Sequence, residues 1–563
     1  LLLFIIPGFL LDNNKYNIIH MIGISLSFWI VTFWFLKFIP IDMDILFYIV
    51  LIISLFIFYR KKKLDFSKHN KQVLFVILIV LLLRLVPFFL NYFPASADMS
   101  FHTLTTKIIT LNNSFPNTYG PVLPTIKFGG YPIGFHILSS YISILSEMPV
   151  YRATLFMANF SYAFLTLALF VFLKKYFKTL IALIASLIVT FLTTNPQFFI
   201  SWGGNPFVLS VGFLIIGVSL LENLFTLDFH EKIFLALCMA ASFLTHPMPI
   251  YGFLYIYLPV FIYRLFKEKN SKHQIKSMVI ISLIFFAFLL PFFMHFNFSV
   301  SNQEIEWTKE RQQTKYLSWK GNISNFYYSI PAFILLVFGE SFSILIIIGL
   351  IFLSMNKELF FKTLLMLISG IILIINSSYW FLPYSYLLFS ERIAILLLIP
   401  FSIAMGYLIK IILDKKILNN YLPKSMHFPF QTIFFILIII LSYSNYTHYL
   451  TVSNYYSMVT KQDLDAFDWI LENTEQDALF LNNYGDAGLW IPAITLRKSR
   501  TIQTVPVYFD ETEKYLSSLK PNYVYFGEKM VYTKELDYYS YDSQPELYEK
   551  VYVNDKVTIF RIK

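Results

Sequence analysis

Apolar runs of about 20 residues, each bounded by polar or basic positions, follow one another along the first 450 residues of the chain. A helix needs about 20 mostly apolar residues to cross the hydrocarbon core of a bilayer. The pattern therefore predicts a polytopic α-helical membrane protein with about 13 to 14 spans, Leu1–Leu11 being counted as the remainder of one. The other runs are Asn17–Ile39, Asp44–Tyr59, Gln72–Phe93, Pro149–Leu173, Thr179–Ile200, Asn205–Phe225, Glu231–Pro247, Ile250–Phe266, Ser277–Phe296, Pro331–Met355, Leu359–Trp380, Arg392–Leu413 and Phe428–Leu450.

The composition supports this prediction. Of the 563 residues, 57% are hydrophobic and only 14% are charged, whereas soluble domains carry about 25% charged residues. The single cysteine, Cys238, excludes an intrachain disulfide and a cysteine-based metal cluster. The sequence holds no P-loop, GxGxxG, GxSxG, HExxH or CxxC element, so it does not indicate the nucleotide or zinc chemistry of soluble enzymes.

Basic residues cluster between adjacent runs and predict an orientation by the positive-inside rule. The clusters are Arg60–Lys63, Lys174–Lys178, Arg264–Lys276 and Lys410–Lys424. With all four in the cytoplasm, the connection Pro94–Met148 and everything after residue 450 lie outside. The tail from residue 450 holds 12 Lys and Arg against 17 Asp and Glu, so the net charge of +10 comes from the membrane part. This basic excess orients the spans and does not indicate a nucleic-acid partner.

The outer connection holds two amphipathic segments. Asp98–Leu111 carries apolar residues at helical spacing, with His102 on a neighbouring polar face. Pro132–Glu147 is short for a span and carries a polar stripe that includes His136. We expect both to be helices that lie at the outer membrane surface, separated by a link rich in proline and glycine.

After about Tyr455 the composition becomes that of a soluble domain. Thr460 and Asp463 form a capping-box variant ahead of an amphipathic helix, and strand-like segments and a further helix follow. Residues 1–71 are expected to form extra N-terminal transmembrane helices, 72–455 a transmembrane core with outer-surface helices at 98–147, and 456–563 a small extracytoplasmic α/β domain. The predicted strands are Ala478–Leu481, Tyr523–Phe526, Val551–Val553 and Val557–Ile562, with a helix near Glu511–Leu519.

Asp98 is the first candidate for chemistry. It closely follows a span on the outer side, with His102 one helical turn later. A carboxylate there suits a general base that accepts a proton from an attacking hydroxyl; the alternative is an N-terminal helix charge favoured by the helix dipole. His102 can orient the carboxylate or share a divalent cation such as Mg²⁺ or Mn²⁺ with it, although a metal site needs more ligands than these two. His136 can line the same cavity, or it can simply be a polar residue on the water-facing side of its helix.

Arg392 begins an apolar span on the outer side, next to Glu391. Its planar donor fork suits the phosphate of a lipid substrate; the alternative is that Glu391 and Arg392 form an interface anchor. Arg152, near the start of its span, is a second phosphate candidate. Arg84 lies inside an apolar run, where an ionisable side chain faces a cavity or a partner, and snorkelling to the surface is the alternative.

Two loops offer aromatic and amide groups. Trp202 and Asn205 belong to a Trp-Gly-Gly-Asn loop that can approach a sugar by stacking and hydrogen bonds, or form a tight turn. In the tail, a turn rich in Gly and Asn follows a predicted strand and contains Tyr484, Asp486 and Trp490. This turn can bind a ligand through backbone N–H groups, amides and an aromatic face; a structural strand-to-helix turn is the alternative.

This layout resembles the GT-C superfamily of membrane glycosyltransferases. The resemblance rests on a span that leads into Asp98, two outer helices, the motif Pro-Ile-Gly-Phe-His (Pro132–His136), an arginine that opens a span (Arg152), many further spans and an outward C-terminal domain. It covers the chain from about residue 72, and the earlier spans look like an addition to the GT-C-like core. The segment Asn483–Ile491 is similar in place and composition to the Trp-Trp-Asp-Tyr-Gly region of oligosaccharyltransferase catalytic subunits.

The resemblance implies a hexosyltransferase of the cell membrane that moves a sugar from a polyprenyl-phosphate carrier to a lipid, glycan or protein acceptor outside. Asp98 would be the general base and Arg392 would contact the carrier phosphate. Two departures argue against sequon-reading transfer of an oligosaccharide: Asn482 and Asn483 stand where Trp-Trp-Asp would be, and Ser100 replaces the second acid of an Asp-x-Asp. The second departure also weakens the metal assignment.

Two other functions stay open. One is an oligosaccharyltransferase or lipid-linked glycan ligase of the same fold. The other is a transporter or flippase, which predicts inverted repeats and charged residues at mid-membrane. The sequence shows no internal repeat, and most unusual polar residues cluster at one face. Arg84 and Glu340 fit the transporter better, but we expect the span to begin near Glu340, at the outer interface.

Overall fold

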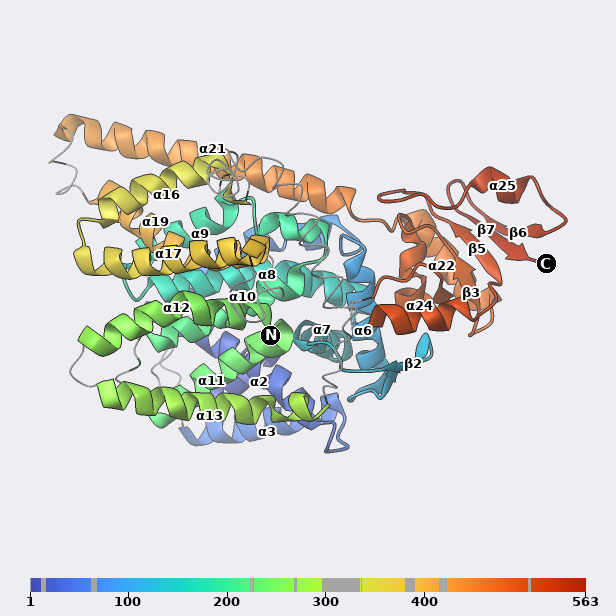
Figure 1. Ribbon diagram of the computed structural model, residues 1–563, viewed down its shortest axis with the longest axis horizontal. Coiled ribbons are helices and arrows are strands. Elements are labelled where there is room, and N and C mark those ends of the chain that lie inside the picture. Colours follow the sequence, from blue (N-terminus) through green and yellow to red (C-terminus); the bar gives the residue numbers. More distant parts are fainter. Residues whose placement is uncertain are drawn as a thin grey trace.

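The computed structural model is a bundle of long helices with a sheet domain at one end (Figure 1). It describes residues 2–11, 17–61, 68–222, 224, 227–267, 271–295, 335, 337–379, 390–414, 419, 423–504 and 508–563. Up to residue 295 its helices are α1 (Leu2–Leu11), α2 (Ile18–Phe35), α3 (Met43–Lys61), α4 (Lys68–Arg84), α5 (Val86–Leu90), α6 (Asp98–Asn112), α7 (Gly134–Ser146), α8 (Val150–Leu173), α9 (Thr179–Leu192), the 3-10 helix η1 (Gln197–Ser201), α10 (Asn205–Leu221), α11 (Phe229–Thr245), α12 (Met248–Lys267) and α13 (Ser271–His295).

Later helices complete the bundle and build the C-terminal domain. In the bundle these are α16 (Glu340–Leu353), α17 (Lys357–Tyr379), α18 (Ser390–Leu396), α19 (Leu398–Leu413) and α21 (Lys424–Tyr455). The C-terminal domain contains α22 (Lys461–Asn473), η4 (Ala487–Trp490), α23 (Ile491–Thr495), α24 (Phe509–Ser517) and α25 (Tyr538–Asp542). The strands are β1 (Thr118–Tyr119), β2 (Leu123–Lys127), β3 (Leu479–Leu481), β4 (Lys498–Ser499), β5 (Tyr523–Phe526), β6 (Tyr548–Val553) and β7 (Thr558–Ile562).

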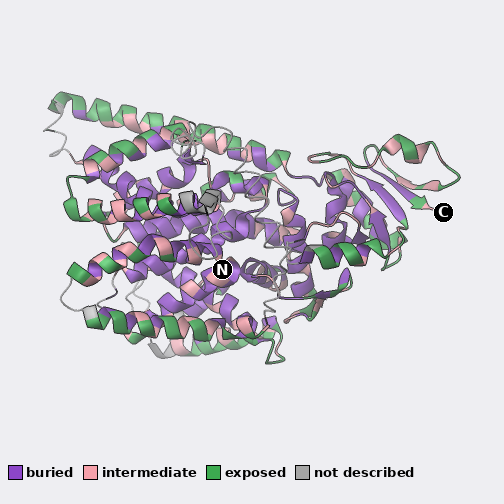
Figure 2. Cartoon of the chain, in the orientation of Figure 1, coloured by how far each residue is buried: buried purple, intermediate pink, exposed green. Residues whose placement is uncertain are grey.

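The burial of the helices fits a multi-pass membrane protein. Within the described residues, α2, α8, α12, α13 and α21 are long and apolar enough to cross a bilayer by length and composition, and shorter apolar helices accompany them. In the most apolar 18-residue stretch of α8, 94% of the residues are buried. In the corresponding stretches of α13 and α21 only 28% and 11% of the residues are buried. Figure 2 shows α21 and α13 at opposite edges of the bundle with exposed surfaces. Since these surfaces are apolar, a bilayer is the solvent that suits them.

Proline ends two predicted runs early. Gln72–Phe93 is not one helix: α4 ends at Arg84, and Pro87 lies in the first turn of α5. Thr179–Ile200 likewise breaks after Leu192, with Pro196 at the start of η1. A proline lacks the N–H that the helix ladder needs, and it disfavours the helical conformation in the preceding residue.

The connection Pro94–Met148 contains the two expected helices, and both are largely buried within the protein. Almost all of α6 and the first ten residues of α7 are covered, because α7, α8 and α23 pack on α6. The hydroxyls of these helices bond to carbonyls: Thr106 donates to His102 at 2.9 Å, and Ser140 donates across to Thr106 at 3.1 Å. The hairpin of β1 and β2, which the sequence analysis did not predict, joins the two helices.

The C-terminal domain contains a five-stranded mixed sheet with the order β4-β3-β5-β7-β6. β3 pairs in parallel with β4 and β5, and β7 pairs antiparallel with β5 and β6. The capping box at Thr460 and Asp463 is present at the start of α22. Strand β4 escaped prediction because two residues carry no periodicity. The domain packs against the end of the bundle that carries α6 and the hairpin (Figure 1).

Candidate active site

Asp98 is the first residue of α6, in the layer between the helix bundle and the C-terminal domain. The chain reaches it through Ser96, whose backbone is left-handed with a φ of 89°. The Ser96 N–H donates to the carbonyl of Tyr456 at 2.9 Å, which ties this turn to the end of α21. The Asp98 side chain is partly buried. An acidic group in the first turn of a helix is stabilised by the helix dipole, so this position favours the ionised carboxylate.

Side chains of the C-terminal domain reach Asp98. The amide Nε2 of Gln503 donates to Asp98 Oδ1 at 2.8 Å, and the hydroxyl of Tyr484 donates to Gln503 Oε1 at 2.8 Å. The Tyr532 hydroxyl donates to the carbonyl of Ser201 at 3.1 Å. Burial raises the pKa of Tyr532, and the nearby Asp98 charge adds to the rise. The sequence analysis selected Tyr484 but missed Gln503 and Tyr532, because no local motif marks either of them.

Gly203 explains why the Trp-Gly-Gly-Asn loop can lie against Asp98. Its φ is +84°, and a Cβ built there would lie 2.7 Å from the Cβ of Asp98 and 2.8 Å from the Oγ of Ser96. Only a residue without a side chain fits this approach. The paired glycines of the loop are the sequence signal that could have placed it beside the acid.

Arg392 lies in α18, with its guanidinium carbon 5.0 Å from the centre of the Trp202 ring. Its Nη1 donates to His246 Nε2 at 3.3 Å. Because a guanidinium can only donate, His246 Nε2 accepts this bond and the imidazole is neutral. The ring of Trp202 and the imidazole orient the plane of the guanidinium. The sequence analysis did not select His246 as a site residue.

Tyr131 connects the acid with the arginine. Burial raises the pKa of Tyr131 to about 12, with the Arg392 charge lowering it and the Asp98 charge raising it. The Trp-Gly-Gly-Asn loop gives the geometric link, because Gly203 lies against Asp98 and Trp202 lies under the guanidinium of Arg392. The structure thus brings Asp98 and Arg392 to the same end of the bundle, although they are far apart in the sequence.

His102 and His136 form a buried pair below Asp98. His102 Nδ1 and His136 Nε2 are 2.9 Å apart, so one ring donates to the other. Burial lowers the pKa of His102 to about 4, against a smaller opposing effect of the Gly203 backbone, and burial followed by nearby His102 lowers that of His136 well below its usual range. The pair is neutral at physiological pH. Within the described part of the chain, no three His, Cys, Asp or Glu side chains form a group suited to a metal ion.

Asp486 and Trp490 lie inside the C-terminal domain. The Asp486 carboxylate caps η4: it accepts the Gly488 N–H at 2.8 Å, the Asn483 amide at 3.2 Å and the Gly527 N–H at 3.4 Å. Burial raises its pKa to about 7. Trp490 is fully buried, with its ring edge-on to Phe93 at 5.3 Å. The contacts of Asp486 stabilise the turn, and the contact of Trp490 with Phe93 docks it on the bundle. These are the contacts expected of a structural strand-to-helix turn.

Arg152, Asn205 and Glu391 complete the predicted site residues. Arg152 donates to the carbonyls of Asn91 at 2.6 Å and Phe88 at 3.1 Å, so it caps the end of α5. Asn205 begins α10, and its amide donates to the sulfur of Met99 at 3.1 Å. Met99 is the residue that follows Asp98 in α6. The side chain of Glu391 lies outside the described residues.

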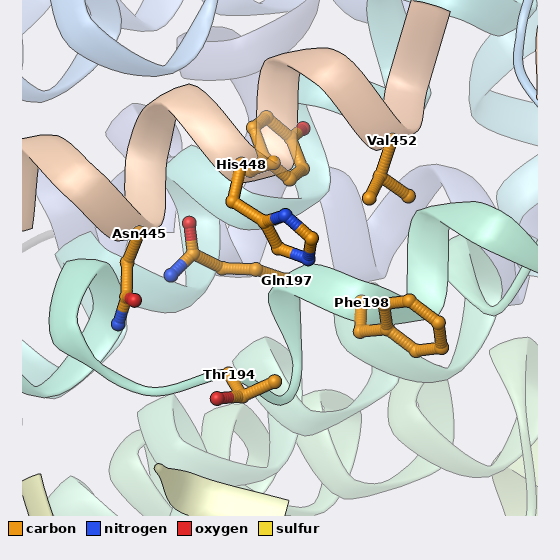
Figure 3. A pocket seen from close by; sticks show the side chains of 7 residues that line it. Thr194, Gln197, Phe198, Asn445, His448 and Val452 are labelled. Carbon is orange, nitrogen blue, oxygen red and sulfur yellow. The ribbon is translucent and has the colours of Figure 1, made fainter. Parts of the chain in front are cut away.

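A small pocket lies between η1 and α21, beside the segment that leads to Trp202. Figure 3 shows the side chains of Gln197, Asn445 and His448 gathered around it. Gln197 is buried and donates to the carbonyls of Phe191 and Thr193 at 2.9 and 2.7 Å. The full lining is Thr194, Gln197, Phe198, Asn445, His448, Tyr449 and Val452. None of the predicted site residues lines this pocket, so it is separate from the group around Asp98.

Arg84 lies near this pocket and is almost fully buried. Its Nη2 donates to the carbonyl of Thr190 at 2.5 Å, and its guanidinium carbon lies 3.6 Å from the centre of the Phe191 ring. Arg84 therefore packs on the last turn of α9 and does not snorkel to the surface. Glu340 begins α16, as predicted.

Solved structures define the class of fold. The crystal structure of the Archaeoglobus fulgidus oligosaccharyltransferase in the apo form matches with a TM-score of 0.54 at 13% identity, covering 82% of this chain and 70% of that one. The crystal structure of ArnT from Cupriavidus metallidurans bound to undecaprenyl phosphate matches with a TM-score of 0.50 at 10% identity, covering 87% of this chain and 97% of that one. The chain therefore has the fold of GT-C membrane glycosyltransferases.

A family model also matches the sequence. The chain belongs to the family described as a family of unknown function, DUF6541, whose profile matches residues 59–404. The match includes α6, α7 and Arg392 and ends before the C-terminal domain. No curated protein matches the sequence significantly.

Proposed function

We propose that the protein transfers a single sugar from a polyprenyl-phosphate carrier to an acceptor at the outer face of the membrane. The observation that carries this proposal is that one loop lies against both residues: a Cβ at Gly203 would meet the Asp98 Cβ at 2.7 Å, and the Trp202 ring centre lies 5.0 Å from the guanidinium carbon of Arg392. A carrier-linked sugar already has a phosphate leaving group, so the enzyme needs chiefly a positioned base and a cation at the phosphate. The likeness to ArnT, whose structure contains undecaprenyl phosphate, supports a carrier of this kind.

In the proposed reaction the acceptor hydroxyl gives its proton to the Asp98 carboxylate as its oxygen attacks the anomeric carbon. The bond between that carbon and the phosphate oxygen breaks, and its electron pair leaves with the polyprenyl phosphate. Arg392 would neutralise the added charge through a planar donor fork. Neutral His246 and the ring of Trp202 hold the guanidinium for this task.

The same geometry supports an extracytoplasmic C-terminal domain. Gln503 and Tyr484 meet Asp98, so the domain lies at the end of the bundle that carries the connection Pro94–Met148. The basic clusters assign that end to the outside. Acceptor and base would then meet between the membrane part and the domain.

Asp98→Asn tests the proposal. The purified full chain would be reconstituted in liposomes with undecaprenyl-phosphate hexoses and a membrane extract as the source of acceptor, and released undecaprenyl phosphate would be measured. Transfer should fall at least about 1,000-fold in the variant while its thermal unfolding is unchanged. Turnover at the wild-type rate would rule out Asp98 as the base.

A second candidate is transfer of a preassembled glycan, which the likeness to the A. fulgidus oligosaccharyltransferase favours. Mass analysis of the modified acceptor separates the two: one hexose added supports the first proposal, and a larger glycan supports the second.

A further inference from the structure

The amide of Gln503 has a fixed orientation. Its Oε1 accepts the hydroxyl hydrogen of Tyr484 at 2.8 Å, and its Nε2 donates to Asp98 Oδ1 at 2.8 Å. A carboxylate is a pure acceptor, and an amide has one accepting and one donating end. A flipped amide would place its oxygen against the carboxylate and its N–H₂ against the tyrosine hydroxyl. Tyr484 therefore keeps the donating end of Gln503 directed at Asp98.

The C-terminal domain holds Tyr484 and Gln503 in register with each other. Asn482, two residues before Tyr484, accepts the Ser499 hydroxyl at 2.6 Å and the Thr501 N–H at 3.3 Å through its Oδ1. These bonds join the end of β3 to the segment after β4, which carries Gln503. Tyr484 and Gln503 therefore contact the helix bundle with fixed positions relative to each other.

The same domain contacts the bundle at further points. The Tyr532 hydroxyl donates to the carbonyl of Ser201 at 3.1 Å. Trp490 packs edge-on against Phe93. The position of the Gln503 amide relative to Asp98 therefore depends on how the C-terminal domain is docked.

We propose that Gln503 is a positioning residue for Asp98 and that the C-terminal domain, through Tyr484 and Gln503, sets the orientation of the base. This inference rests on the proposed function, because it gives Asp98 its role. Gln503 acts through the carboxylate: it holds Oδ1, so that the plane of the carboxylate has one direction relative to Arg392 and Trp202. Among the described residues, Tyr131 and Tyr532 are titratable groups that lie near Asp98.

A donor on Oδ1 also stabilises the ionised carboxylate over the protonated form. Loss of the Gln503 amide should therefore raise the pH at which Asp98 takes up a proton by about one unit, a tenfold change in its proton affinity. Loss of the Tyr484 hydroxyl should give a smaller shift in the same direction, because the amide can then turn away. A residue that only stabilised the fold would leave this pH unchanged.

Carbodiimide labelling measures this pH without requiring turnover. The full chain in nanodiscs would be treated with dicyclohexylcarbodiimide, which reacts with protonated carboxyls, over a pH series. The labelled Asp98 peptide would be quantified by mass spectrometry. Gln503→Ala should shift the midpoint upward, and Tyr484→Phe should shift it less. The control Gln544→Ala, which lies just after α25 in the same domain, should match the wild type. An unshifted midpoint in a folded Gln503→Ala protein would overturn the proposal; should that variant fail to fold, Tyr484→Phe decides in the same way.

Kinetics provide the second readout. With undecaprenyl-phosphate hexose as donor, Gln503→Ala should lower kcat about tenfold and leave KM for the donor unchanged, since the residue does not touch the carrier phosphate. A raised KM with unchanged kcat would contradict positioning of the base. If the wild type transfers no sugar, the proposed function fails, whereas the labelling still decides whether Gln503 controls Asp98.

Discussion

The backbone of Gly203 passes so close to Asp98 that a methyl group at position 203 would lie 2.7 Å from the Asp98 Cβ. The left-handed φ of +84° at Gly203 makes this approach possible. The loop that carries Trp202 toward Arg392 is thus the same loop that fixes where Asp98 lies. The candidate base and the stacking partner of the candidate phosphate ligand depend on one glycine.

Gly203→Ala should therefore move Asp98 and break its bond to Gln503. The left-handed conformation costs a non-glycine residue about 1 to 2 kcal/mol, which a bundle of this size should tolerate, but transfer should fall at least about tenfold. Sugar transfer and thermal unfolding would be measured together. Gly120→Ala, where the nearest atom lies at 3.3 Å, is the matched control. Full activity in Gly203→Ala would show that the close approach does not position the acid.

Arg392→Lys should weaken binding of the polyprenyl carrier even though the charge is kept. A lysine lacks the planar fork and the flat face that lies over Trp202, and hydrogen bonds to charged groups contribute about 1.5 to 3 kcal/mol. The dissociation constant for undecaprenyl phosphate, measured on the full chain in nanodiscs, should rise about 10- to 100-fold. Arg561→Lys, an exposed position on β7, should leave it unchanged. Equal affinities in wild type and Arg392→Lys would argue against the phosphate role.

The pair of His102 and His136 should make the fold sensitive to acid. The unfolded chain binds a proton at a histidine near pH 6.5, whereas folded His102 does so only near pH 4. Its contribution is therefore complete above about pH 6.5 and is lost as the pH falls toward 4, at about 1.4 kcal/mol per pH unit. His102→Asn should reduce this dependence in thermal unfolding at pH 7.5 and 5.0, and His273→Asn, at an exposed site, should not. Parallel profiles for His102→Asn and wild type would contradict a buried neutral pair.

Asp486→Ala should destabilise the C-terminal domain locally. The substitution leaves the Gly488 N–H, the Gly527 N–H and the Asn483 amide without their acceptor, and a buried donor left unpaired costs about 1 to 3 kcal/mol. Hydrogen exchange of the full chain should accelerate in peptides that cover β3, η4 and α23. Asp555→Ala, in an exposed turn, should leave the exchange as in wild type. Unchanged protection in Asp486→Ala would mean that the carboxylate does not hold this turn.

Local pattern was sufficient for most helices and strands. Asn17 caps α2, α8 begins directly after Pro149, and β5 has the predicted bounds. The exceptions follow from competing local rules, such as the break that Pro87 imposes on a continuous apolar run. The burial of α6 was not predictable in this way, because the amphipathic pattern of α6 does not reveal which elements pack on it. In the structure these are α7, α8 and, from the C-terminal domain, α23.

The residues of the candidate site also fall into two groups: those that the sequence could identify and those that only the structure could. The chemistry of single positions made Asp98 and Arg392 candidates from the sequence. An acid just after a span suits a general base, and a guanidinium at the start of a span suits a lipid phosphate. Gln503, His246 and Tyr131 carry no such mark. They became part of the site only through their contacts with those two residues.

The sequence by itself determined where the helices run, which ends carry the basic clusters and which charged groups border the membrane, because hydrophobicity and charge act over neighbouring residues. Only the tertiary structure decided that an amide near residue 500 meets a carboxylate near residue 100. It also decided that the Asp486 carboxylate accepts hydrogen bonds from groups inside its own domain. Such contacts depend on how separately formed elements pack, and packing is a property of the whole chain.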